Sequence, residues 1–363
     1  MRASGEDLLT QIAFAGTAGH VLDFDDTFAD GVAHLSAPCA PAALVLAAHL
    51  GRSVADMLDS YARGFEAMGA LAQASHPALY DAGWHPTAVC GSYGAAIVGS
   101  RLLGLSGSRR ADAVAIALLR ASGTRGAFGS DGKAIQVGLA AAAGVQAGLL
   151  ARAGASVDSR AIHSRVGFEG VTGARLPPSE DGDRLLAIER NWIKLYPSCL
   201  GTHAPIEAAM VAREQGHRPD RDRVEVRVHP LARQAAYLDE VSDGLAAKFS
   251  IPYCVGQTFL HGPPGVRDFD SIDPEVARLA GQVDVTIDSS LPPFGAVLSR
   301  AGDELSSLAA PTGAAERPVS PEALTRKLTD LAGHRLDGIL DDPDLPAAAV
   351  LDAVALRTPA RSR

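Results

Sequence analysis

The sequence has few cysteines, and their arrangement does not suggest a disulfide framework. Its 363 residues include four of them, Cys39, Cys90, Cys199 and Cys254, and no two form a CxxC pair. Four thiols are too few to staple a chain of this length, which predicts a reducing, cytoplasmic compartment. The opening residues, MRASGEDLLTQ, lack the basic and apolar regions of a signal peptide, so we expect none.

A block of basic residues is also missing. The formal net charge is −9, and neither nucleic acid nor an anionic membrane is expected as a partner. With 47% apolar and 21% charged residues, the chain is too apolar for disorder and too polar for a membrane bundle. The long uncharged stretch at residues 134–151 is mostly alanine and glycine, which predicts a buried helix rather than a transmembrane span.

The order of predicted elements indicates three parts. The alanine-rich first part predicts helices at residues 39–51, 53–71, 87–104, 109–122, 137–153 and 156–166. After a loop at 176–183, alternating residues predict strands at 224–228 and 283–287, and a hairpin of 296–300 and 304–308. Between them we expect helices at 203–214, 246–260 and 274–281, and further helices at 320–333 and 345–356 before a fraying tail, RTPARSR.

The predicted fold is therefore multidomain, α and α+β. A large all-helical domain (1–191) carries an inserted smaller α/β lid domain (192–314), and C-terminal helices (315–363) return to the helical domain.

The densest polar segment is HVLDFDDT (20–27), which is followed by His34. If the segment is helical, Asp23 and Thr27 lie one turn apart on one face. Acidic groups in an apolar region cost desolvation energy unless they are paired or functional, and the alternative is a helix end solvated by its acids. The spacing is not typical of a metal site, and no metal is predicted.

Two further segments carry basic side chains. His85 precedes Pro86 and would lie at a helix N-terminus, where it either caps the helix or acts as a neutral base or hydrogen-bond donor. The glycine-rich loop 123–133 does not match a phosphate-binding P-loop, but it delivers Lys133, the only lysine among the first 190 residues. That lysine is either a contact for a carboxylate or an ordinary surface residue.

The predicted domain boundary carries the remaining candidates. Lys194 and Cys199 lie in WIKLYPSCLGTH (192–203), at a boundary where clefts form. Cys199 has no obvious partners that would make it a nucleophile. In AKFSIPYC (247–254), Tyr253 can donate or accept a proton, and the simpler interpretation is a core tyrosine.

Taken together and in this order, these segments resemble the MmgE/PrpD family, which includes 2-methylcitrate dehydratase, cis-aconitate decarboxylase and iminodisuccinate epimerase. The resemblance covers nearly the whole chain. It rests on HVLDFDDT (20–27), HLSAPCAPAAL (34–44), GWHPTAVCGSYGAA (83–96), FGSDGKAIQVGLAAAAGV (128–145), IKLYPSCLGTH (193–203), AKFSIPYCVG (247–256) and RPVSPEALTRKL (317–328). It implies a helical domain with an α/β lid, a homodimer and no cofactor.

The resemblance also implies roles for individual residues. Lys133 and Lys194 would bind a substrate carboxylate, and His85 and His34 are the candidates for base and acid. Asp23 and Thr27 would orient a histidine or bind a hydroxyl, and Tyr253 would protonate or hold a leaving hydroxyl. Two positions depart from the family pattern but would still contact the substrate: Gln136 stands where relatives commonly have histidine, and Cys199 where the decarboxylase branch has histidine.

The function that the resemblance implies is a cofactor-independent lyase. We expect a dehydratase that abstracts a proton next to a carboxylate of a small hydroxy-di- or tricarboxylate. An epimerase or a decarboxylase on the same scaffold is the alternative. A third alternative is a non-catalytic binding protein, because relatives carry several helices before the first motif and this chain is expected to be shortened there.

Overall fold

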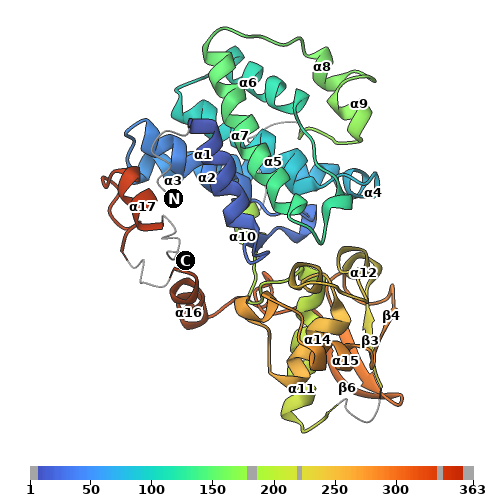
Figure 1. Cartoon of the computed structure of the whole chain (residues 1–363). Coiled ribbons are helices and arrows are strands. Elements are labelled where there is room, and N and C mark those ends of the chain that lie inside the picture. The colour runs from blue at the N-terminus through green and yellow to red at the C-terminus, as the bar shows by residue number, and fades with distance from the viewer. Residues whose placement is uncertain (1–6, 178–185, 219–222, 333–337, 355–363) are drawn as a thin grey trace.

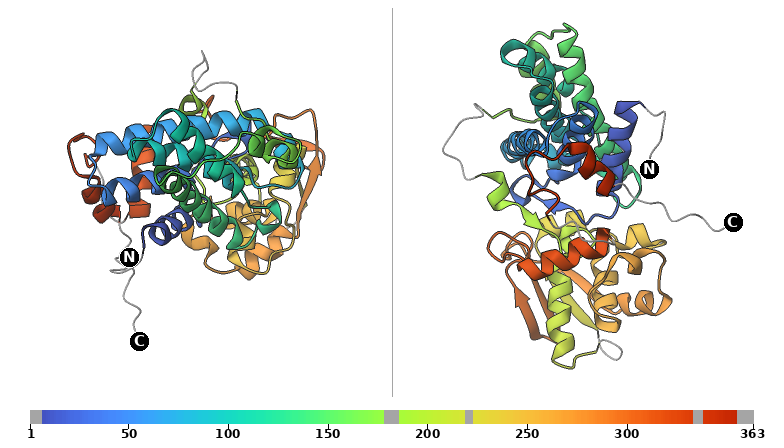
Figure 2. Two further views of the ribbon diagram at one scale, coloured as in Figure 1. Left: turned by 90° about the horizontal axis from the view of Figure 1, so that it is seen from above. Right: turned by 90° about the vertical axis from the view of Figure 1, so that its left-hand side faces the viewer.

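The computed structural model describes residues 7–177, 186–218, 223–332 and 338–354, and Figures 1 and 2 show a helical body and a smaller α/β body. The helical body contains short turns and the longer helices that form its core. Its helices are α1 (Leu8–His20), α2 (Ser36–His49), α3 (Val54–Ser75), α4 (Ala78–Asp81), α5 (Pro86–Leu102), α6 (Gly107–Leu119), α7 (Gly132–Arg152), α8 (Arg160–His163), α9 (Phe168–Thr172) and α10 (Ala187–Arg190), with 3-10 turns η1 (Ala29–Gly31) and η2 (Arg125–Ala127).

Small residues let the central helices pack closely. Helix α7 packs against α1, α5 and α6, and α5 also packs against α3. At Gly144 of α7, a Cβ atom would lie 2.6 Å from the carbonyl oxygen of Ser92 in α5, so any larger residue would push the two helices apart. This packing holds the start of α7 beside the start of α5, and both helix starts carry predicted site residues.

Helix α7 is long and apolar enough to cross a membrane by length and composition. In the structure, 61% of its apolar window is buried within the protein. It is thus a core helix of the helical body, and the α1, α5 and α6 contacts account for its lack of charge.

The α/β body is built on a mixed sheet in the order β4-β3-β5-β6. Strand β3 (Val224–Val228) pairs parallel with β4 (Val283–Ile287) and antiparallel with β5 (Ala296–Arg300), which forms the predicted hairpin with β6 (Asp303–Leu308). The helices of this body are α11 (His203–Glu214), α12 (Pro230–Ala235), α13 (Gly244–Ala247), α14 (Ile251–Leu260) and α15 (Pro274–Ala280), with 3-10 turns η3 (Leu200–Thr202) and η4 (Val266–Phe269).

Two short connections link the bodies. Strand β1 (Asp26–Thr27) of the helical body pairs antiparallel with β2 (Trp192–Ile193), so Lys194 follows directly after a strand that is fixed to the HVLDFDDT segment. After β6, the chain forms α16 (Pro321–Ala332) and α17 (Ala347–Val354), and α17 packs against α2 and α3. The inserted-lid arrangement and the three domain boundaries stay predictions.

Most predicted elements are present, and the differences have local causes. The helix expected at 156–166 is wrong: only α8 lies there before Ser164 becomes extended. The helix expected at 246–260 is divided because Ser250 is extended and caps a new helix, α14. Helix α1 was not predicted; Asp7 caps it by accepting the amides of Leu9 and Thr10. The loop expected at 176–183 falls from Pro178 onward outside the described residues, as does the tail RTPARSR.

The condition under which Asp23 and Thr27 would share a helix face is not met. Helix α1 ends at His20, Asp23 has a left-handed φ of 51°, and Asp26 and Thr27 form a strand. Asp23 and Thr27 therefore do not share a helix face. They come together because a turn and a strand lead into the same cavity.

Candidate active site

A cavity of about 450 Å³ is lined by both bodies. The helical body contributes Asp23, Thr27, Val32, His34, Tyr80, His85, Phe128 and Lys133, and the α/β body contributes Lys194, Cys199, Leu200, Ala235, Phe249 and Phe294. Seven of the nine predicted site residues are among them. The walls are mainly aromatic and aliphatic, with charged groups on one side, as is typical of a small-molecule site.

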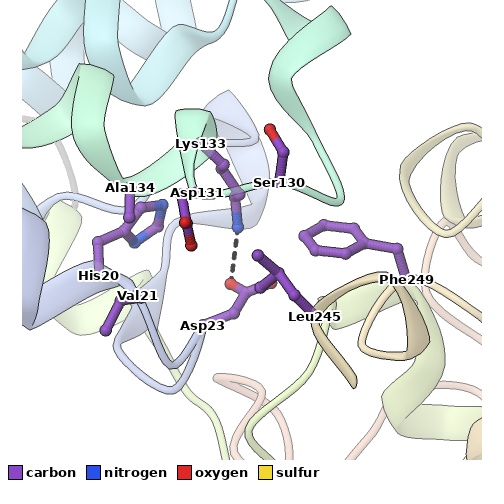
Figure 3. Close-up of a pocket in the computed structure, with 9 residues that line it drawn as sticks. All are labelled: His20, Val21, Asp23, Ser130, Asp131, Lys133, Ala134, Leu245 and Phe249. Atoms are coloured by element: carbon purple, nitrogen blue, oxygen red, sulfur yellow. Dashed lines mark hydrogen bonds and ion pairs between the residues drawn. The ribbon is translucent and has the colours of Figure 1, made fainter. Parts of the chain in front are cut away.

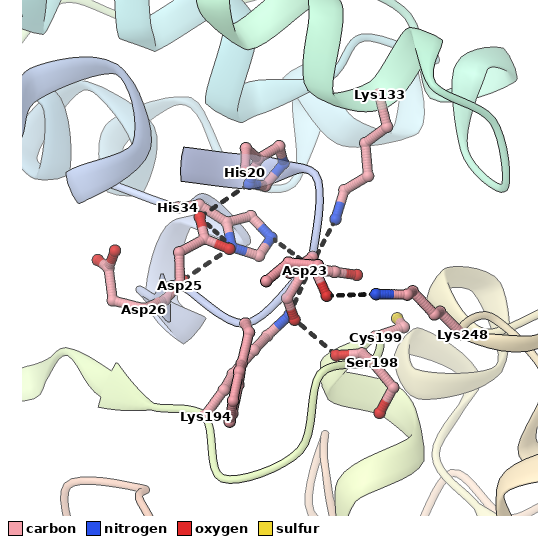
Figure 4. Close-up of polar contacts among 12 residues, drawn as sticks. His20, Asp23, Asp25, Asp26, His34, Lys133, Lys194, Ser198, Cys199 and Lys248 are labelled. Atoms are coloured by element: carbon pink, nitrogen blue, oxygen red, sulfur yellow. Dashed lines mark hydrogen bonds and ion pairs between the residues drawn. The ribbon is translucent and has the colours of Figure 1, made fainter. Parts of the chain in front are cut away.

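Asp23 lies at the centre of the charged side, where it pairs with two lysines (Figure 4). Its Oδ1 atom accepts hydrogen bonds from Lys133 Nζ at 2.8 Å and from Lys194 Nζ at 2.6 Å. All three residues are buried, with 2%, 7% and 1% of their surfaces exposed. Burial alone would raise the pKa of Asp23, but the two ammonium groups hold it well below its ordinary value.

Two residues of the cavity wall have unfavourable backbone conformations. Asp23 and Val32 have φ angles of 51° and 49°, in the left-handed region that side chains other than glycine rarely adopt. For Val32 the branched side chain makes this more costly. Such strain persists only where the surrounding structure enforces it, and it is common at functional sites.

The other two lysines of the chain also reach this segment. Lys248 Nζ donates to the carbonyl of Leu22 at 2.7 Å, and Lys327 Nζ of α16 donates to the carbonyl of Phe24 at 2.7 Å. Burial lowers the pKa of each to about 8. Sequence analysis did not single out either residue. The available signal was rarity, because the chain has only these four lysines and all four contact residues 22–24.

His34 and His85 face the cavity as uncharged imidazoles. Burial lowers the pKa of His34 to about 4, despite the attraction of Asp25. Its Nδ1 lies 2.7 Å from the backbone carbonyl of Asp26, and its Nε2 lies 3.8 Å from Asp23 Oδ1. Burial, together with the charges of His20 and Lys133, holds the pKa of His85 well below its ordinary value. His85 Nδ1 lies 2.6 Å from Gln136 Nε2.

Behind His34 lies a second group of polar residues. His20 Nδ1 is 2.8 Å from Asp25 Oδ2, and His34 Nδ1 is 3.3 Å from the same oxygen. Ligand atoms of His20, Asp25 and His34 lie within 4.8 Å of one another, a spacing that could hold a metal ion. The carboxylate of Asp25 already lies between the two imidazoles and contacts both. The ammonium groups of Lys133 and Lys194, which pair with the neighbouring Asp23, would also repel an added cation.

Three buried oxygens at the cavity have no hydrogen-bond partner among the described residues. They are Thr27 Oγ1, Asp23 Oδ2 and the hydroxyl oxygen of Tyr80. Buried polar atoms are nearly always satisfied, so unpaired ones in a cavity wall indicate where a ligand binds. Cys199 lines the same cavity, but burial raises the pKa of its thiol, which makes it a poor nucleophile.

A smaller cavity of about 250 Å³ is also lined by the Lys133–Asp23 pair (Figure 3). It shares Asp23, Lys133 and Phe249 with the main cavity and is also lined by Ser130, Asp131 and Leu245. The loop before α7 therefore borders both cavities, and the ion pair lines both.

The structure does not bring Tyr253 to the main cavity. Its hydroxyl accepts a hydrogen bond from the amide of Asp273 at 3.0 Å, and its ring packs in the core of the α/β body with Tyr196 and Ile206. Its position is that of a core tyrosine. Gln136 is not a wall residue either; it contacts His85 from behind.

Comparison with known proteins matches both halves of the chain to one family. Residues 9–179 match the MmgE/PrpD N-terminal domain, and residues 196–351 match the MmgE/PrpD C-terminal domain. Cis-aconitate decarboxylase of Homo sapiens is 30% identical over 215 residues, which cover 56% of this chain and 44% of that protein. The enzyme of the same name from Aspergillus terreus is 29% identical over 216 residues, 54% of this chain and 44% of that protein. Each match covers less than half of the relative's length.

Proposed function

The chain belongs to the MmgE/PrpD family, and from this premise we propose that it is a cofactor-independent lyase that eliminates water from a small hydroxy-di- or tricarboxylate. One observation carries the proposal: two buried lysines and a buried aspartate meet at a cavity with unpaired oxygens and two neutral imidazoles. This arrangement fits proton removal next to a carboxylate.

The substrate carboxylate would bind beside Lys133 and Lys194. Asp23 neutralises only one of the two ammonium charges, so an excess positive charge is available for an anion. When a proton leaves the neighbouring carbon, negative charge spreads onto that carboxylate, and the lysines stabilise it most strongly in a site shielded from water. The unpaired Thr27 hydroxyl would hold the substrate hydroxyl.

The elimination then needs a base and a proton for the leaving group. An imidazole takes the proton from the carbon, the C–O bond breaks, and the hydroxyl leaves as water after it accepts a proton. The imidazoles that line the cavity, His34 and His85, are the candidates for these roles, since Tyr253 lies elsewhere.

Decarboxylation is the second candidate, and the relatives favour it. Those named above are cis-aconitate decarboxylases. The aromatic walls, with Phe128, Phe249 and Phe294, also favour loss of charge from a carboxylate placed against them. Cys199, at a position where that branch has histidine, is the argument against it.

A lid and a dimer are part of the proposal. The cavity walls come from both bodies, which supports an inserted α/β lid (192–314) that closes on the substrate over the helical domain. The homodimer and the absence of a cofactor follow from the family resemblance alone, and the cytoplasmic compartment follows from the few cysteines.

Incubation with methylcitrate, citrate, substituted malates and cis-aconitate tests the proposal. Dehydration gives new alkene absorbance, decarboxylation gives carbon dioxide, and epimerisation gives solvent deuterium in the recovered acid without loss of water. We expect the first result, which Lys133→Met should abolish. A folded protein that gives none of the three would refute the lyase proposal and favour a binding protein.

A further inference from the structure

The orientation of the Gln136 side chain is fixed by the backbone of Thr124. The amide N–H of Thr124 donates to Gln136 Oε1 at 3.0 Å, and an N–H group can only donate. On the same residue, the carbonyl oxygen accepts from Gln136 Nε2 at 3.3 Å, and a carbonyl can only accept. The two backbone groups together determine which end of the Gln136 amide is oxygen and which is nitrogen.

This orientation determines where the proton of His85 lies. Gln136 Nε2 is a donor, and it lies 2.6 Å from His85 Nδ1, which must therefore accept. A neutral imidazole has one accepting and one donating nitrogen, so the proton of His85 is on Nε2. That nitrogen has no hydrogen-bond partner within the described residues, and the ring lines the cavity.

His34 has the opposite arrangement. Its Nδ1 lies 2.7 Å from the carbonyl oxygen of Asp26, so Nδ1 carries the proton. The lone pair is then on Nε2, the nitrogen on the Asp23 side of the ring. The two imidazoles thus present different groups to the cavity, His34 a base and His85 an N–H donor.

The two histidines also differ in what happens if they move a proton. If His34 takes a proton it becomes an imidazolium, and Asp25 at 3.3 Å stabilises that charge. If His85 gave up its Nε2 proton while Nδ1 accepts from Gln136, it would become an imidazolate, which is far too basic to form near neutral pH. His85 can therefore donate a hydrogen bond but is not suited to transfer a proton.

We propose that Gln136 is a positioning residue that makes His85 a fixed hydrogen-bond donor, so that His34 alone moves protons. This inference rests on the proposed function. His34 Nε2 takes the proton from the carbon next to the substrate carboxylate. The Nε2–H of His85 then donates a hydrogen bond to the carboxylate oxygen on which negative charge develops. The protonated His34 then returns the proton to the departing hydroxyl, which leaves as water as the C–O bond breaks and the C=C bond forms. All atoms and protons balance without a second acid.

Substitution with glutamine separates the two roles. Glutamine keeps an N–H donor but cannot transfer a proton. We expect His85→Gln to retain much more activity than His85→Ala, whose loss should be roughly 10²- to 10³-fold, as for other donors to a developing oxyanion. His34→Gln and His34→Ala should instead lose activity equally, by about 10²- to 10⁴-fold. Equal losses for both His85 variants would overturn the inference.

A measurement without substrate keeps the test independent of folding defects and of the proposed reaction. In ¹⁵N-histidine-labelled protein, ring nitrogen shifts should show His85 protonated at Nε2 and His34 at Nδ1, with His85 unchanged between pH 5 and 8. Gln136→Glu should move the His85 proton to Nδ1, because a carboxylate only accepts. Gln146→Glu, ten residues further along α7, is the matched control and should change neither ring.

The outcomes separate the two proposals. A proton on Nδ1 of His85 in the unmodified protein would overturn this inference whatever the activity. The expected proton positions together with no turnover of any acid tested would overturn the proposed function and leave the assignment of the two imidazoles standing.

Discussion

The chain uses lysine and arginine in two different regions. The four lysines reach one loop, residues 22–24, where they are buried or half-buried and share a carboxylate and backbone carbonyls. Several arginines form ion pairs at the surface, such as Arg223 with Asp284 beside the β3–β4 pair, where the side chains are 55% and 50% exposed. The difference follows from shape: a guanidinium matches one carboxylate with two parallel bonds, whereas compact ammonium groups can crowd around one oxygen and leave room for an anion.

Removal of Lys133 tests the functional half of this comparison most strongly. Lys133→Met should lower turnover about 10³-fold, since the charge that stabilises the transition state is lost. The fold should survive because Lys194 still pairs with Asp23. The measurement is kcat/KM on the best acid of the panel, with the circular dichroism spectrum as control. A turnover that does not change would remove Lys133 from the mechanism.

Asp23→Asn tests the stability half. It leaves two ammonium groups in a buried site without a carboxylate, and we expect the free energy of unfolding to fall by about 3–5 kcal/mol. Urea denaturation measures this. A loss close to zero would mean that solvent reaches the lysines and that the site is not a buried ion cluster.

The pH dependence of activity gives a smaller effect. The pKa of Lys248 is lowered to about 8 because burial disfavours its charged form, so it is charged below pH 8 and neutral above. We expect kcat/KM to fall as the pH rises through 8. Lys248→Arg keeps the charge at all these pH values, so in this variant the fall of kcat/KM should begin at a higher pH. Lys327, also lowered to about 8, limits that gain.

The smallest effect is expected when the same substitution, aspartate to asparagine, is made at the surface. Asp284→Asn removes the partner of Arg223 but leaves both side chains in water, so stability should hardly change and added salt should abolish the difference. It is the matched control for Asp23→Asn. A loss as large as that of Asp23→Asn would show that the two regions do not differ as proposed.

The sequence predicted the elements better than the shape of the site. Helix starts with strong local signals, such as Ser53 and Pro86, agree with the structure because capping is decided within a few residues. The left-handed Asp23 was not predicted, since an aspartate carries only a weak signal for a conformation that tertiary contacts enforce. Tyr253 is a similar case, because only the packing of α14 decides which way its ring points.

Residues far apart in the sequence explain the rest. Lys248 and Lys327 reach Leu22 and Phe24 across separations of more than 200 residues, and local pattern cannot reveal such contacts. Gln136 is different: its spacing from Lys133 places both on the first turns of α7, and the departure from the family pattern marked it. The sequence does not show how Gln136 acts on His85, because the orientation of the Gln136 amide depends on hydrogen bonds with the backbone of Thr124.

Because every lysine contacts one loop, the fold also determines how fast the protein reacts with amine-modifying reagents. Apart from the α-amino group, acylating reagents and lysine-specific proteases have no side-chain target outside this loop and its neighbours. Modification of the folded protein should therefore be slow, and its rate should follow the opening of the two bodies. A bound acid that keeps the two bodies closed would protect all four lysine side chains together. The labelling rate would then measure how much of the protein has acid bound, without any need for turnover.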